Sequence, residues 1–173
     1  MDGGGSISRT RADPHKVHLD TCYARPILLD WDSDRDTHLV ARSLLHSRKR
    51  SGPLTISLPV LGETLLTVMN DIARGELEPE TASGLVRRLR HLVSTSQIVL
   101  CGLGNHNDSS PLGIAADLLS LDSEVSQSDA LVTAVAISCV DCEILYTSDR
   151  LLLTSPEINK RARESGLSVR PAP

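Results

Sequence analysis

Aromatic side chains are almost missing from this chain of 173 residues. It contains no Phe, one Trp and two Tyr, so aromatic residues make up 2 % of the sequence. Its core must therefore be packed from Leu, Val, Ile and Ala. Proteins that hold single-stranded nucleic acid by base stacking need exposed rings, so the composition argues against that mode of binding.

Long apolar runs are missing as well. No stretch is apolar over enough residues to span a membrane, and polar or charged residues are spread through the first 24 positions, unlike a secretory signal. We therefore expect a cytoplasmic protein without membrane contact. In that compartment disulfides are not expected. The cysteines concerned are Cys22, Cys101, Cys139 and Cys142.

Positive charge is in deficit, with 18 Lys and Arg against 22 Asp and Glu. A net charge of −4 disfavours a protein whose whole surface binds nucleic acid, but it leaves room for a local basic patch. Two basic clusters, at 46–50 and 87–91, are candidates for binding RNA phosphates. Taken singly, each is better interpreted as a solvated helix face or helix end.

The chain nevertheless has the composition of one folded domain. Hydrophobic residues make up 40 % of it, which suits a packed core in a domain of this length. Residues 1–24 begin with a Gly-rich stretch and show no periodicity, so we expect a flexible N-terminal segment there. Residues 25–170 are predicted to form the folded domain.

Short apolar segments alternate with amphipathic ones from residue 25 onward. The predicted strands are 26–30, 54–58, 97–103 and 143–146, with a short edge strand at 167–170. Helical patterns separate them. Strands separated by helices pair in parallel through right-handed crossovers. The predicted fold is therefore a three-layer α/β/α domain with a central, mainly parallel sheet of four to five strands.

Four acidic residues lie at or near the ends of apolar segments. They are Asp30, Glu63, Asp129 and Asp149. Because sites in parallel sheets form outside the carboxyl ends of the strands, these side chains are predicted to face one cavity. Such a cluster must bind a cation or repel itself, and Mg²⁺ or Mn²⁺ suits oxygen ligands. A hard cation activates water and neutralises phosphate charge, so the pattern favours phosphodiester hydrolysis.

Each acid also has an ordinary structural interpretation. Asp129 before an apolar run is typical of a helix cap, Asp149 of a turn and Asp30 of a strand end. Glu63 is harder to explain in this way, because it lies among apolar residues and must face inward. A buried carboxylate needs a partner.

Four segments carry a resemblance to a known family. They are 27–30 (Ile-Leu-Leu-Asp), 61–66 (Leu-Gly-Glu-Thr-Leu-Leu), 128–136 (Ser-Asp-Ala-Leu-Val-Thr-Ala-Val-Ala) and 144–150 (Ile-Leu-Tyr-Thr-Ser-Asp-Arg). In order and spacing they resemble the PIN domain, the nuclease fold also used by VapC-type toxins, over about residues 25–166.

The resemblance implies a metal-dependent endoribonuclease. In it, Mg²⁺ or Mn²⁺ is held by the positions of Asp30, Glu63, Asp129 and Asp149, and Thr147 or Ser148 matches the hydroxyl residue before the last acid. It also implies an RNA substrate, an antitoxin partner for toxin-type members, and homodimers formed through apolar helix faces. One position departs from the family, because Asp32 stands where Asn or Ser is usual. This extra carboxylate would add a metal ligand or alter the metal preference.

Three alternatives use the same residues. A non-catalytic PIN-like module would keep the fold and pair its acids internally. A haloacid-dehalogenase-like phosphatase would use Asp30 as nucleophile and Asp32 as general acid, but the Lys and paired Asp that it requires have no clear counterpart. The alternating acids from Asp30 to Asp36 lack the Gly and the final Glu of a calcium loop.

The pair Cys139 and Cys142 has the spacing of a redox or zinc motif, although it follows a helix and has no second pair. We interpret both as buried thiols. Gly102 and Gly104 are interpreted as a turn, and His106 as an exposed loop residue.

Overall fold

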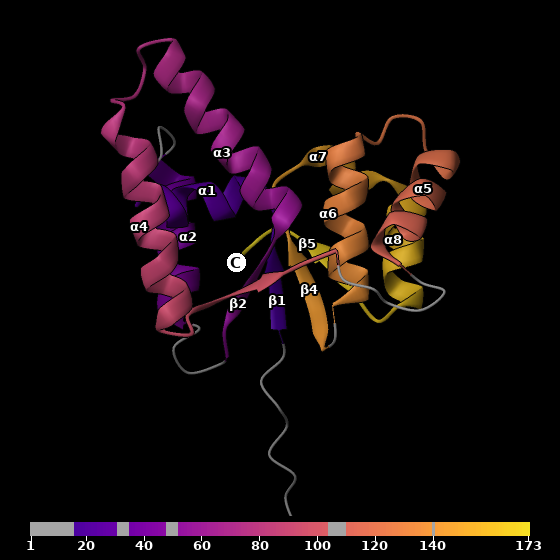
Figure 1. Cartoon of the computed structure of the whole chain (residues 1–173). Coiled ribbons are helices and arrows are strands. Elements are labelled where there is room, and N and C mark those ends of the chain that lie inside the picture. Colours follow the sequence, from indigo (N-terminus) through magenta and orange to yellow (C-terminus); the bar gives the residue numbers. More distant parts are fainter. Residues whose placement is uncertain (1–15, 31–34, 48–51, 104–109, 140) are drawn as a thin grey trace, which may run out of the picture.

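One parallel sheet occupies the centre of the computed structural model, which describes residues 16–30, 35–47, 52–103, 110–139 and 141–173 (Figure 1). Its strands are β1 (Lys16–Leu19), β2 (Leu54–Ser57), β3 (Ile98–Cys101), β4 (Cys142–Tyr146) and β5 (Ser168–Arg170). Their order is β3-β2-β1-β4-β5, and every neighbouring pair is parallel. The strand that comes first in the chain therefore lies in the middle of the sheet.

Helices cover both faces of this sheet. They are α1 (Thr21–Leu29), α2 (Arg35–Ser47), α3 (Leu58–Ala73), α4 (Glu80–Ser94), α5 (Pro111–Leu121), α6 (Gln127–Ser138), α7 (Arg150–Thr154) and α8 (Pro156–Glu164). Figure 1 shows α1, α2 and α4 on one side and α5, α6 and α8 on the other. The predicted three-layer α/β/α fold with a parallel sheet is confirmed.

Three helices begin with the same short signal, a Ser followed within two residues by Pro. The hydroxyls of Ser57, Ser110 and Ser155 accept the amides of Val60, Gly113 and Ile158 at the starts of α3, α5 and α8. A Ser cap satisfies one of the unpaired amides at a helix start, and Pro at the first positions has no amide to satisfy. This signal explains why α3, α5 and α8 begin at these positions.

The first strand was predicted in the wrong place. Residues 26–30, predicted as a strand, belong to α1 and its C-terminal cap, while β1 comes from residues 16–19. The physical reason is that a buried run of four apolar residues suits a strand and a buried helix turn equally well. The error also moves the start of the folded part, because residues 16–24 were assigned to the flexible segment and form β1 and the beginning of α1.

The core is aliphatic, as the composition predicts. Its largest fully buried side chains include Leu19, Ile27, Leu28, Leu54, Ile56, Leu85, Leu92, Ile98, Leu118, Leu145, Leu152 and Ile158. A second, smaller cluster lies between α5, α6 and α8. No helix among the described residues meets the length and hydropathy needed to cross a membrane.

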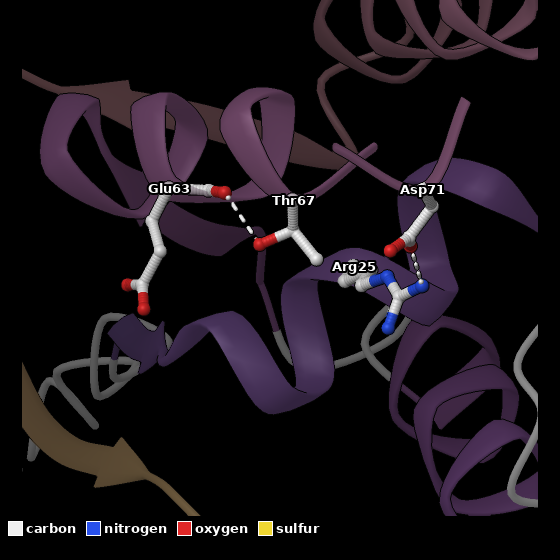
Figure 2. Close-up of polar contacts among 4 residues, drawn as sticks. All are labelled: Arg25, Glu63, Thr67 and Asp71. Atoms are coloured by element: carbon white, nitrogen blue, oxygen red, sulfur yellow. Dashed lines mark hydrogen bonds and ion pairs between the residues drawn. The ribbon is translucent and has the colours of Figure 1, made fainter. Parts of the chain in front are cut away.

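An ion pair fixes α1 against α3. The Arg25 guanidinium donates to the Asp71 carboxylate at 2.8 Å, and Asp71 is only 8 % exposed. Breaking the pair would leave buried Asp71 without its counter-charge, so this contact resists sliding of the two helices. Figure 2 shows the pair, and shows the Glu63 side chain pointing away from it at the other end of the drawn stretch of α3.

His18 is fully buried in the central strand. The Thr55 hydroxyl donates to the Val17 carbonyl, so its oxygen accepts the Nδ1–H of His18 at 2.9 Å. Nε2 then has no hydrogen-bond partner among the described residues. Burial lowers the pKa of His18 from 6.5 to about 4, so the imidazole is neutral in the folded chain.

We predict that His18 makes the fold acid-sensitive. Its folded-state pKa lies below its unfolded value, so the unfolded chain takes up the proton first as the pH falls. The stability that neutral His18 supplies is complete above about pH 6.5 and is lost toward pH 4, by about 3 kcal/mol. Urea unfolding across this range measures it.

His18→Gln should flatten this pH dependence, even if it lowers the stability at neutral pH. The matched control is His91→Gln, because His91 is exposed on α4. An equal pH dependence in wild type and His18→Gln would contradict the prediction.

Candidate functional site

Asp20 follows β1 directly and is the acid that the sequence interpretation missed. Its side chain is 6 % exposed and caps α1. Oδ1 accepts the amide of Thr21, and Oδ2 accepts the hydroxyl of Thr147, each at 2.6 Å. The available signal was the segment 17–20 (Val-His-Leu-Asp), an apolar alternation that ends on an acid.

Glu63 lies in α3, close to Asp20. Its Oε2 accepts the hydroxyl of Thr21 at 2.7 Å and the hydroxyl of Ser128 at 2.9 Å. Thr21 follows Asp20 in the chain, and Ser128 precedes Asp129. One carboxylate oxygen of Glu63 therefore joins the start of α1 to the start of α6.

The last two acids lie at the starts of helices. Asp129 is in the first turn of α6, and its Oδ2 accepts the hydroxyl of Ser126 at 2.6 Å. Asp149 caps α7 through Oδ1, which accepts the amide of Leu151 at 2.6 Å. The amide of Asp149 donates to the Thr147 hydroxyl at 2.9 Å, so Thr147 links Asp149 to Asp20.

The electrostatics show that these acids share one neighbourhood. Burial raises the pKa of Asp20 most, hydrogen bonds from Thr147 and Thr21 oppose it, and the charges of Asp129 and Glu63 raise it further. Burial likewise raises the pKa of Asp129, with the charges of Asp149 and Glu63 adding to the effect. Four carboxylates thus repel one another at the carboxyl ends of β1 and β4.

The donor set suits a hard cation, but the present side-chain positions do not form a coordination sphere. Among the described residues, no three Asp, Glu, His or Cys side chains are placed so that they could hold a metal ion. Glu63, Asp129 and Asp149 each use one carboxylate oxygen in the hydrogen bonds above, which leaves the other oxygen for a cation. Joint coordination requires rotation of these side chains.

Cys22 adds a thiol to this edge of the sheet. Its Sγ lies 3.7 Å from Asp20 Oδ2 and accepts the amide of Ser148 at 3.2 Å. Burial, then the charge of Asp20, raises the pKa of Cys22 to about 11. The thiol therefore stays neutral and adds no negative charge. The Ser148 side chain is exposed, so Thr147 rather than Ser148 is the hydroxyl residue that contacts the acids.

Asp30 does not lie where the sequence interpretation placed it. It ends α1 in a left-handed conformation with φ 57°, and its carboxylate pairs with Arg88 of α4 at 3.3 Å. Ten residues of helix rise separate it from Asp20 by about 15 Å. The predicted strand-end position was wrong, and this also removes the basis of the phosphatase alternative. Asp32 lies outside the described residues, as do Gly104 and His106.

The basic clusters are described in part. In the cluster at 87–91, Arg87, Arg90 and His91 are exposed on α4, whereas Arg88 pairs with Asp30 and donates to the Ile27 carbonyl. This cluster is therefore a solvated helix face with one structural member. In the cluster at 46–50, residues 48–50 lie outside the described part of the chain.

Comparison with known proteins identifies the fold. No family model matches the sequence, and no curated protein matches it. A solved structure, that of Mycobacterium tuberculosis VapC20, described as a toxin that cleaves the sarcin–ricin loop, is similar with a TM-score of 0.56. The two share 21 % sequence identity, and the match covers 81 % of this chain and 95 % of that one. The chain therefore has a VapC-like fold, which confirms the predicted resemblance at the level of fold.

We predict that Thr147 stabilises the ionised acids. Thr147→Val keeps the shape but removes a donor to buried Asp20, so the free energy of unfolding should fall by about 1–3 kcal/mol at pH 7. The lost bond holds the pKa of Asp20 down, so the deficit should shrink as the pH falls through that pKa. Chemical denaturation of wild type and Thr147→Val at pH 7 and at a pH below the pKa of Asp20 measures the deficit.

Thr154→Val is the matched control, because Thr154 is exposed and its hydroxyl donates to the Arg150 carbonyl within its own helix turn. If Thr147→Val lowers the free energy of unfolding as little as Thr154→Val does, the role assigned to Thr147 is contradicted.

Proposed function

We propose that this chain is a metal-dependent endoribonuclease that hydrolyses RNA phosphodiester bonds. The observation that carries the proposal is the meeting of Asp20, Glu63, Asp129 and Asp149 at the carboxyl edge of a VapC-like sheet. Asp20 replaces Asp30 in the set of acids predicted from the sequence. We also propose that the chain acts in the cytoplasm.

The four carboxylates are the proposed ligands of Mg²⁺ or Mn²⁺. Their oxygens are the donors that both ions prefer. Burial is the main cause of the raised pKa values of Asp20 and Asp129, and a cation would offset the mutual repulsion that adds to it. When bound, such an ion lowers the pKa of a coordinated water and neutralises charge on the scissile phosphate.

Neighbouring hydroxyls position the carboxylates. The Thr147 hydroxyl donates to Asp20, and the Thr21 and Ser128 hydroxyls donate to Glu63. These three hydrogen bonds fix two acids that come from different elements. Because Asp20 is buried, solvent has little access to its oxygens. Exposed Arg87 and Arg90 on α4 are available to contact phosphates along an RNA strand.

Partner chains are part of the proposal. Leu66 and Met69 of α3 are 68 % and 55 % exposed, which supports a helix face that a second copy covers. We propose a homodimer on this basis and, if the chain acts as a toxin, an antitoxin that binds it.

A non-catalytic PIN-like binding module is the second candidate. Two observations favour it, since hydroxyl or amide donors already engage the four acids and the described residues hold no ready-made metal-binding group. Such a module would bind RNA or protein with the acids locked in these hydrogen bonds. Metal binding and cleavage distinguish it from the nuclease.

We predict metal-dependent cleavage of RNA that requires Asp20. The wild-type chain should cleave a sarcin–ricin-loop RNA or total RNA with Mg²⁺ or Mn²⁺, and EDTA should abolish cleavage. Asp20→Asn should lower the rate by at least about 100-fold, because loss of one central ligand weakens both metal binding and charge stabilisation.

Asp30→Asn is the matched control and should retain the rate within about threefold, since Asp30 pairs with Arg88 away from the acids. Cleavage that persists in EDTA, or that depends on Asp30 and not on Asp20, would overturn the nuclease assignment.

We also predict that Mn²⁺ stabilises the wild-type chain. A ligand that binds only the folded state raises the melting temperature with its concentration. Asp129→Asn should weaken this rise, because it removes one charge from the four-acid set. Asp117→Asn, which changes an exposed acid on α5, should leave it intact. Equal responses of both variants would place Mn²⁺ elsewhere.

A further inference from the structure

Two thiols from distant parts of the chain meet away from the carboxylates. Cys101 ends β3 and Cys139 caps the C-terminus of α6, and their sulfur atoms lie 3.1 Å apart. Both cysteines are reduced thiols and half-buried. The sequence interpretation grouped Cys139 with Cys142 by spacing alone, whereas the fold brings it to Cys101.

The short distance between the two sulfur atoms favours a disulfide. Bonded sulfur atoms lie about 2.05 Å apart, so the two thiols need to approach by roughly 1 Å. Each cysteine stands at the end of its element. Half-burial leaves both thiols within reach of a small oxidant.

The two thiols are electronically unequal. The hydrogen bond with Cys101 lowers the pKa of Cys139, burial opposes this, and the Lys16 ammonium lowers it further. The same hydrogen bond, with burial, raises the pKa of Cys101. Cys139 is therefore the member of the pair that ionises first, and the thiolate is the form that peroxides oxidise.

Cys142 is a weaker partner for Cys139 despite the Cys-x-x-Cys spacing. It is buried in β4, and its thiol donates to the Ile144 carbonyl at 3.6 Å. Burial, then the charge of Cys139, raises the pKa of Cys142 to about 12.

We propose that Cys101 and Cys139 form a reversible disulfide when the chain meets a peroxide. The Cys139 thiolate attacks hydrogen peroxide, an S–O bond forms, the O–O bond breaks, and the departing hydroxide takes a proton to become water. Cys101 then loses its proton and attacks the sulfenic sulfur. The S–S bond forms, the S–O bond breaks, and hydroxide leaves as water with that proton.

The net reaction converts two thiols and one peroxide into a disulfide and two waters, and a thiol reductant reverses it. The bond would cross-link the edge strand β3 to the far end of α6, the helix whose first turn carries Asp129. Oxidation would thus brace that helix against the sheet without touching the acids.

The test is disulfide mapping of the full chain after treatment with hydrogen peroxide. The expected product has lost about 2 Da by intact mass, contains a peptide linked through Cys101 and Cys139, and reverts with dithiothreitol. Cys142→Ser should give the same product. A link between Cys139 and Cys142, a link between chains, or thiols that all remain open to alkylation would overturn the proposal.

Two variants separate its steps. Cys101→Ser should leave Cys139 as a sulfenic acid that dimedone traps, whereas Cys139→Ser should give neither the trapped adduct nor the linked peptide. If either variant fails to fold, the wild-type map decides alone. The inference is independent of the nuclease, so Asp20→Asn should form the same disulfide whether or not the wild type cleaves RNA.

Discussion

The sheet depends on β1, the strand Lys16–Leu19 at its centre. β1 pairs with β2 on one side and β4 on the other, so its backbone polar groups are satisfied only when both neighbours are in place. The amide of Asp20 extends the ladder by donating to the Tyr146 carbonyl at 3.0 Å. The same pairing that completes the sheet therefore sets the position of buried Asp20. Structure and candidate chemistry depend on one strand.

Hydroxyl groups then convert this placement into a defined cluster. Thr147 reaches from the end of β4 to Asp20, and Thr21 and Ser128 converge on Glu63 from two different helices. Thr147 stabilises the ionised form of Asp20, while burial and the charges of Asp129 and Glu63 favour its neutral form. The balance leaves Asp20 and Asp129 with raised pKa values. Such a balance is easily altered by a positive charge.

The sequence predicted the fold class better than it predicted the first acid. The Ser and Pro signals before α3, α5 and α8 depend only on neighbouring residues, so they could be recognised directly. Glu63 stood out because it interrupts an apolar helix. β1 escaped notice because only Val17 and Leu19 carry its apolar signal, while buried His18 looks polar. The apolar run before Asp30 was longer, so the first strand was predicted there instead. The contact of Cys101 with Cys139 depends on tertiary structure and has no local signal.

The sheet order also has a consequence for biosynthesis. Val17 pairs with Ile144, and Asp20 bonds Thr147 across 127 positions of sequence, so the contacts that complete the centre have high contact order. A chain emerging from the ribosome exposes β1 with one edge open until β4 has been translated. The carboxylates cannot assemble before that moment. Nascent fragments therefore lack the assembled cluster, and any activity that depends on it begins only when synthesis of the domain is nearly finished.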